Sequence, residues 1–156
     1  MHVGVVSHTG VFSVIPHGSQ EQPELWAGVW VHDAAGPVLI EHSGTKRTIQ
    51  AGFLVTRSSK VRVVDSHARF SERDGYFLDD LSGASIRGGT AGLDGRGIYL
   101  GPGTSGVVVS GVLVSRSRVL DCYDASAGDG TAGTANTWTD NRGRRSDPVG
   151  LCQPPS

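Results

Sequence analysis

Two adjacent carboxylates, Asp79 and Asp80, have the clearest capacity for chemistry, and a cation, Arg57, lies 23 residues before Asp80. Asp33 lies a further 24 residues upstream. Carboxylates beside a cation can serve as a general acid and base, or can hold a uronate through calcium. The same residues can instead form a surface salt ladder, worth about 0 to 1 kcal/mol per pair. No catalytic motif of the hydrolases, lyases or epimerases is matched residue by residue, so the salt ladder is the simpler interpretation.

The ladder is nevertheless where we expect any charged ligand to bind. Asp79 would stand beside it as an unpaired second acid next to Asp80. Carboxylates at adjacent residues repel each other unless a cation or a proton intervenes, so calcium is the cofactor to consider.

A second set of candidates consists of large apolar side chains. Its members are Trp30, Leu54, Phe77 and Tyr99. Together on one sheet face they would exceed the apolar surface that a monomer normally exposes. Such a stripe can stack on sugar rings, or it can lie under a loop or the N-terminal segment, with Trp26 as part of the cover. A slip of one residue would bury Phe77 in place of Tyr76 and weaken both interpretations.

Other chemistry has little support in the sequence. The six histidines show no HxH or HxxxH spacing, so no transition-metal site is predicted. His42 and Asp65 are 23 residues apart, but Gly88 and Gly111 continue the same series. Asp and Gly tolerate the left-handed conformation of sharp turns, so turn geometry explains this series better than catalysis does. Cys122 and Cys152 show no CxxC spacing and form either two buried thiols or one disulfide.

Charge and hydropathy disfavour several partners. Lys and Arg number 14 against 15 Asp and Glu, and the net charge of -1 gives no reason to expect nucleic acid or an anionic membrane. No apolar run approaches the length of a membrane span. The opening MHVGVVSHTG lacks the basic start and apolar stretch of a secretion signal.

The elements that would position these residues repeat along the chain. The segments GVWV, GFLV, GYFL and GIYL begin at Gly28, Gly52, Gly75 and Gly97, at spacings of 24, 23 and 22 residues. A fixed period of this size indicates a solenoid, whose units bury their apolar faces by stacking. Short alternating strands at this period predict an all-β, right-handed parallel β-helix rather than a hexapeptide helix or a leucine-rich repeat.

The alternation within each unit predicts which side chains point inward. The expected first-strand columns are Val29, Phe53, Tyr76 and Ile98, and Val31, Val55, Leu78 and Leu100. The second strand adds Val38, Val61, Ala84 and Val107, and Ile40, Val63, Ile86 and Val109. Burying one such aliphatic side chain is worth roughly 1.5 to 3 kcal/mol, so this core sets the register. Stacked rungs lie ~4.8 Å apart, which brings the acid and base ladder into line.

We expect a single domain over residues 1–156. Residues 1–26 would form an irregular first coil or a cap, and residues 27–121 the regular coils. Residues 122–156 depart from the period, are rich in turn residues and carry Trp138 and Leu151. They would form a C-terminal cap over the open end of the solenoid.

The repeat also resembles a known family. GIYL followed by GVVVSG at residues 106–111 is similar to the right-handed parallel β-helix repeat family, the pectin-lyase-like group that includes copper-site maturation proteins for nitrous oxide reductase. The closing GTAGTANTWTDN and DPVGLC resemble the C-terminal end of actinobacterial secreted members. The resemblance spans roughly Val29 to Cys152 and implies the C-terminal part of a secreted or extracellular protein, with a disulfide between Cys122 and Cys152.

The resemblance implies an association with polysaccharide, for which two hypotheses remain. A lyase, hydrolase or epimerase would use Asp79, Asp80 and Arg57 as catalytic residues. A non-catalytic module would bind glycan or a protein partner through Trp30, Phe77 and Tyr99, with Asp33 beside them. The enzyme requires the acids in a groove, whereas the module requires exposed aromatic rings. No nucleic acid partner and no membrane span are expected, and the oligomeric state is left open.

Overall fold

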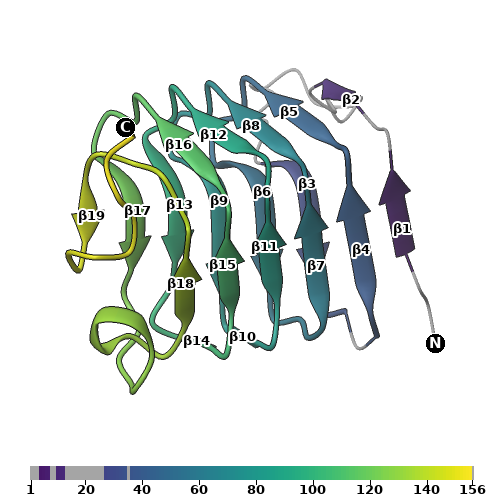
Figure 1. The fold of residues 1–156 in the computed structure, drawn as a ribbon. Helices are drawn as coiled ribbons and strands as arrows, with labels where there is room; N and C mark the ends of the chain where they lie inside the picture. Colours follow the sequence, from purple (N-terminus) through teal and green to yellow (C-terminus); the bar gives the residue numbers. More distant parts are fainter. Residues whose placement is uncertain (1–3, 8–9, 13–26, 35, 156) are drawn as a thin grey trace.

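Short strands separated by tight turns account for most of the computed structural model, which describes residues 4–7, 10–12, 27–34 and 36–155. The strands stack in parallel as a β-solenoid of about five turns, and the described residues contain no α-helix (Figure 1). From β4 over β5 to β6 the chain winds in a right-handed sense. The predicted fold class is therefore confirmed. No helix in the described part of the chain is long and apolar enough to cross a membrane.

Each full coil contributes one strand to each of three parallel sheets. Sheet A contains, in spatial order, β1 (Gly4–Ser7), β4 (Val38–Glu41), β7 (Val61–Val64), β11 (Ser85–Arg87), β15 (Val108–Ser110) and β18 (Thr137–Thr139). Sheet B contains β2 (Gly10–Phe12), β5 (Gly44–Lys46), β8 (His67–Arg69), β12 (Thr90–Gly92) and β16 (Leu113–Ser115). Sheet C contains β3 (Ala27–His32), β6 (Ala51–Thr56), β9 (Asp74–Asp79), β13 (Arg96–Leu100), β17 (Leu120–Asp124) and β19 (Ser146–Asp147). A two-stranded sheet joins β10 (Leu81–Ser82) to β14 (Thr104–Ser105).

The predicted inward columns are confirmed by the strand register. Phe53 pairs with Tyr76, and their rings stack with centroids 4.9 Å apart. Of the sixteen predicted core residues, all are buried except Val29 and Val38, which pack against the core from the first described coils. Because Tyr76 rather than Phe77 is buried, no slip of register has occurred.

The glycine that opens each repeat is required by the close approach of neighbouring coils. A Cβ atom on Gly52 would lie 2.7 Å from the carbonyl oxygen of Gly75, and one on Gly75 would lie 2.6 Å from that of Gly97. These oxygens are backbone atoms and cannot rotate away. The sequence repeat therefore marks the corner where the chain enters sheet C.

The turn between sheets A and B explains the series that begins at His42. His42 and Asp65 adopt positive φ angles of 48° and 44°, and Gly88 and Gly111 adopt 66° and 65° on the next coils. A left-handed residue is needed at this corner on each coil, which confirms the turn interpretation.

The described parts of residues 1–26 already belong to the solenoid. β1 pairs with β4, and β2 pairs with β5, in the same parallel register as the later coils. Trp26 lies outside the described residues, so its expected role as a cover stays a prediction.

The C-terminal segment is more regular than the sequence suggests. β18 extends sheet A, where Trp138 pairs with Val109 and continues the buried column. β19 extends sheet C beyond β17. Leu151 is buried at the same end of the solenoid. Residues 122–156 thus close the solenoid partly by continuing it.

A buried carboxylate organises this end. Asp124 occupies the inward position after Leu100, where the preceding coils carry aliphatic side chains. It accepts hydrogen bonds from Trp138 Nε1 at 2.8 Å and from Asn136 Nδ2 at 3.1 and 3.2 Å. The backbone N–H and the hydroxyl of Ser126 complete its shell at 3.0 and 2.6 Å. These donors compensate the cost of burying the carboxylate.

The predicted disulfide joins Cys122 to Cys152, with the Cα atoms 6.2 Å apart. Cys122 continues the buried column of Tyr76 and Ile98. The bond therefore ties the last segment of the chain to the end of the core.

Candidate functional site

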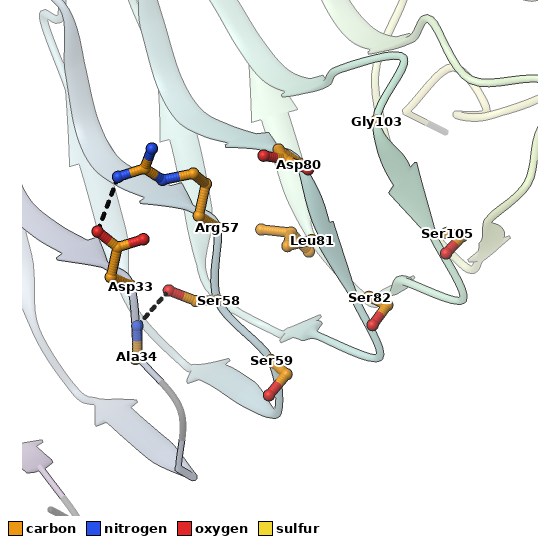
Figure 2. A pocket seen from close by; sticks show the side chains of 10 residues that line it. All are labelled: Asp33, Ala34, Arg57, Ser58, Ser59, Asp80, Leu81, Ser82, Gly103 and Ser105. Carbon is orange, nitrogen blue, oxygen red and sulfur yellow. Dashed lines mark hydrogen bonds and ion pairs between the residues drawn. The ribbon is translucent and has the colours of Figure 1, made fainter.

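The turn that leaves sheet C positions the predicted ladder. Asp33, Arg57 and Asp80 follow the paired strand ends of β3, β6 and β9, and all three have positive φ angles of 52°, 45° and 51°. This backbone turns their side chains outward at one edge of the solenoid (Figure 2). The three residues lie on consecutive coils, as the spacing predicts.

An ion pair forms only on the first step of this ladder. Arg57 Nη2 lies 2.7 Å from Asp33 Oδ2, and His32 Nε2 lies 3.1 Å from the same oxygen. No ion pair links Arg57 to Asp80 among the residues that the structure describes. Because Asp33 and Arg57 are more than half exposed, their pair is worth about 0 to 1 kcal/mol.

Asp79 has a structural partner that the sequence does not suggest. Its Oδ1 accepts the backbone N–H of Asp80 at 2.9 Å and that of Gly103, on the next coil, at 3.1 Å. A Cβ atom on Gly101 would collide with this carboxylate. Asp79 has no ion pair among the described residues, but the turn of the following coil uses its Oδ1 as a hydrogen-bond acceptor, which the sequence does not indicate.

A shallow hollow of about 510 Å³ lies beside the ladder (Figure 2). Asp33, Arg57 and Asp80 line it together with a row of hydroxyls. The row consists of Ser59, Ser82 and Ser105, which pair in register on consecutive coils. This row was not predicted, although its constant spacing of 23 residues is visible in the sequence. Such a hollow can exchange several hydrogen bonds with a ligand rich in hydroxyl groups.

The predicted aromatic stripe occupies the outer face of sheet C. Trp30 pairs with Leu54, Leu54 with Phe77, and Phe77 with Tyr99. The Phe77 and Tyr99 ring centroids lie 5.0 Å apart, and Tyr123 extends the stripe with a centroid 5.3 Å from that of Tyr99. Trp30 is 62% exposed, whereas the other members are half-buried by their neighbours. Tyr123 was not predicted as a member, because the sequence departs from the period after Leu120.

An ion pair braces the stripe from one side. Arg96 Nε and Nη2 donate to the two carboxylate oxygens of Asp74 at 2.6 and 3.0 Å. The Arg96 guanidinium lies 3.9 Å from the ring centroid of Tyr99. Burial raises the pKa of the Asp74 carboxyl, and Arg96 opposes that rise. Burial likewise raises the pKa of the Tyr99 hydroxyl, so this stripe residue stays neutral.

The stripe and the hollow are neighbours. Two residues separate Trp30, on β3, from Asp33, which follows this strand, and one of them, His32, contacts both the stripe and the hollow. Its ring centroid lies 5.1 Å from that of Trp30, and its Nε2 lies 3.1 Å from Oδ2 of Asp33, which lines the hollow. The aromatic rings and the polar row therefore form one band along the solenoid axis.

No group of three or more His, Cys, Asp or Glu side chains that could hold a metal ion is found within the described residues. The calcium hypothesis thus gains no preformed ligand set from this part of the chain.

No family model, curated protein or solved structure matches this chain. The fold assignment as a parallel β-solenoid therefore rests on the strand register, and the function is inferred from the geometry of the band.

Proposed function

We propose that the protein binds an extended glycan along the outer face of sheet C. The observation that carries the proposal is the continuous stripe from Trp30 to Tyr123, with Trp30 62% exposed. The apolar faces of sugar rings stack on aromatic rings. The stripe offers the Trp30 ring and, beyond Leu54, the rings of Phe77, Tyr99 and Tyr123 on three successive rungs ~4.8 Å apart. A linear polymer can follow this direction over several coils.

The adjoining hollow supports the same proposal. Ser82 and its neighbours in the hydroxyl row can donate and accept hydrogen bonds to the sugar hydroxyls, and Asp80 can accept them. Apolar contact beside a few convergent polar groups is the usual composition of a ligand site.

Binding fits the band better than catalysis does. A general acid and base pair made of two carboxyl groups requires both of them to face the substrate. Asp79 is used by the backbone, and Asp33 is paired with Arg57. For the Asp80 carboxylate the described residues supply no ion pair. We therefore assign Arg57, Asp80 and Asp33 to ligand contact and place the module ahead of the lyase, hydrolase or epimerase.

We also propose that the protein works outside the cytoplasm as a member of the pectin-lyase-like group. The Cys122–Cys152 disulfide supports an oxidising compartment. The likeness of the GIYL and GVVVSG segments to that group supports the assignment.

Retention of the protein on insoluble cellulose, xylan, mannan and chitin, with and without calcium, tests the glycan proposal. Trp30→Ala and Tyr99→Ala should each weaken retention about tenfold, because a loss of about 1.4 kcal/mol corresponds to that factor. Phe70→Ala removes an exposed aromatic ring from sheet B and is the matched control. Release of soluble sugar, abolished by Asp80→Asn, would instead favour the enzyme. Retention that both stripe variants leave unchanged would refute the proposed binding face.

A further inference from the structure

The folded chain separates its charges in a way that the net charge conceals. The described strands of sheet B, together with the residue that follows each of β5, β8, β12 and β16, contain no Asp or Glu. The same segments carry four permanent cations. These are Lys46, Arg47, Arg69 and Arg116, all of them exposed.

Strand register places the cations in two rows along the solenoid axis. Lys46 pairs with Arg69, Arg69 with Gly92, and Gly92 with Ser115. The second row begins at Arg47 and ends at Arg116, each one residue beyond its strand. Gly92 has no side chain, so it leaves a gap between Arg69 and Ser115.

The gap at Gly92 is a hollow of about 260 Å³. Arg69 and Arg116 line it with the hydroxyl-bearing Thr90 and Ser115. A second hollow of about 470 Å³ shares Ser115 and Arg116 and adds Arg144 and Arg145 from the C-terminal segment. The two hollows adjoin at Arg116, so the cationic surface continues toward the end of the solenoid.

The arginines that line the hollow at Gly92 lack the acidic partner that Arg57 and Arg96 have. Arg57 pairs with Asp33, and Arg96 pairs with Asp74. For Arg69 and Arg116 the described residues supply no ion pair and no side-chain hydrogen bond. Arg69 does lie over the Phe70 ring, 5.4 Å from its centroid, which holds the side chain near the surface. Guanidinium groups with unused donors are suited to carboxylate and sulfate groups.

We infer that the outer face of sheet B is a second binding site, for an acidic polysaccharide that carries carboxylate or sulfate groups. Rungs ~4.8 Å apart place Arg69 and Arg116 about 10 Å apart along the axis, so one extended polyanion can reach both. Thr90 and Ser115 lie between them and can bond sugar hydroxyls. This site is independent of the aromatic stripe, which belongs to sheet C.

Other polyanionic partners fit the face less well. Single-stranded nucleic acid binds through several aromatic rings that stack on its bases, whereas β5, β8, β12, β16 and the residue after each of them contain a single Phe, Tyr or Trp, which is Phe70. An anionic membrane would need a broad apolar surface, whereas Phe70 and Leu113 are the two exposed large apolar residues there.

Affinity electrophoresis in gels with polygalacturonate, heparin or an uncharged glucan tests the inference. Both polyanions should retard the parent protein in the gel. The retardation should weaken as the salt concentration rises, because binding releases counterions from the polyanion. The double variant Arg69→Gln/Arg116→Gln should bind at least tenfold more weakly, with a shallower salt dependence. Circular dichroism checks that the exposed substitutions leave the fold intact.

Arg62→Gln/Arg87→Gln removes the same charge from the outer face of sheet A and is the matched control. It should retain most of the binding, as should Trp30→Ala, which tests the other site. An equal loss of polyanion binding in both arginine double variants would mean that charge alone attracts the ligand, and it would refute a specific site on sheet B. Absence of retardation by either polyanion at low salt, or tighter binding to single-stranded DNA, would overturn the ligand class.

Discussion

Asp94→Asn should stabilise the protein at neutral pH and change little at acid pH. Asp94 is fully buried at the corner before sheet C, where Oδ1 accepts the backbone N–H of Ser71 at 2.7 Å. Asp94 Oδ2 has no hydrogen-bond partner among the described residues. The side-chain oxygens of Thr48, Ser71 and Ser117, at the equivalent positions of the neighbouring coils, are buried without a partner as well. An ionised carboxylate is therefore poorly compensated in this column.

Burial accordingly raises the pKa of Asp94 from 3.8 to about 6, although the Ser71 N–H opposes the rise. Between these two values the folded state holds a proton that the unfolded state has lost, so stability falls as pH rises. The stabilisation that comes from the proton on Asp94 is fully present below pH 3.8 and is lost above about pH 6. Since one pKa unit corresponds to ~1.4 kcal/mol, the loss by neutral pH is about 3 kcal/mol.

Asparagine keeps an oxygen for the Ser71 N–H and adds amide donors that can reach neighbouring hydroxyl oxygens. Urea unfolding of oxidised protein from pH 4 to 8 measures the effect. At pH 7.5 the free energy of unfolding of the variant should exceed that of the parent by about 1 to 3 kcal/mol, and this difference should vanish near pH 4. Asp74 titrates in both proteins, so its contribution cancels. Asp80→Asn removes the same charge at an exposed position and is the control. Its free energy of unfolding should stay within about 0.5 kcal/mol of that of the parent at every pH. A variant that is less stable by the same amount at every pH would refute the reasoning.

Two further changes test the packing of the coils. Gly75→Ala should lower the free energy of unfolding by at least about 1 to 3 kcal/mol, because its Cβ would lie 2.6 Å from the Gly97 carbonyl oxygen; a parent-like urea midpoint would contradict the close approach. Cys152→Ser should cost about 2 to 4 kcal/mol by opening the link to Cys122, which spans 30 residues. An unchanged melting temperature would show that the end of the solenoid holds without it.

The core of the solenoid was predictable because each coil contacts mainly the coils before and after it. An inward position such as Val63 is repeated at Ile40 and Ile86, so the period and the alternation together define both the register and the buried face. The same argument correctly placed the Trp30 stripe and the Asp33, Arg57 and Asp80 ladder.

The partners of these side chains were less predictable. Asp79 accepts a hydrogen bond from the N–H of Gly103, 24 residues away, because the turn of the next coil brings this donor beside the carboxylate. Periodicity shows which residues stack, but it does not show which backbone groups a turn leaves exposed. Tyr123 was missed for a different reason, since the segment around it changes composition while the solenoid continues.

The charge of sheet B shows most clearly why composition misleads in a solenoid. A net charge of -1 gave no reason to expect nucleic acid or an anionic membrane, because it averages over every face of the molecule. The solenoid places each position of the repeat on one face. Cations at equivalent positions, such as Lys46 and Arg69, therefore line up in a row on that face, which a net charge does not reveal. Where that row meets Gly92, the missing side chain turns it into a hollow between cations. Charge counted by position within the repeat, rather than over the whole chain, is therefore the measure that predicts the partners of such a protein.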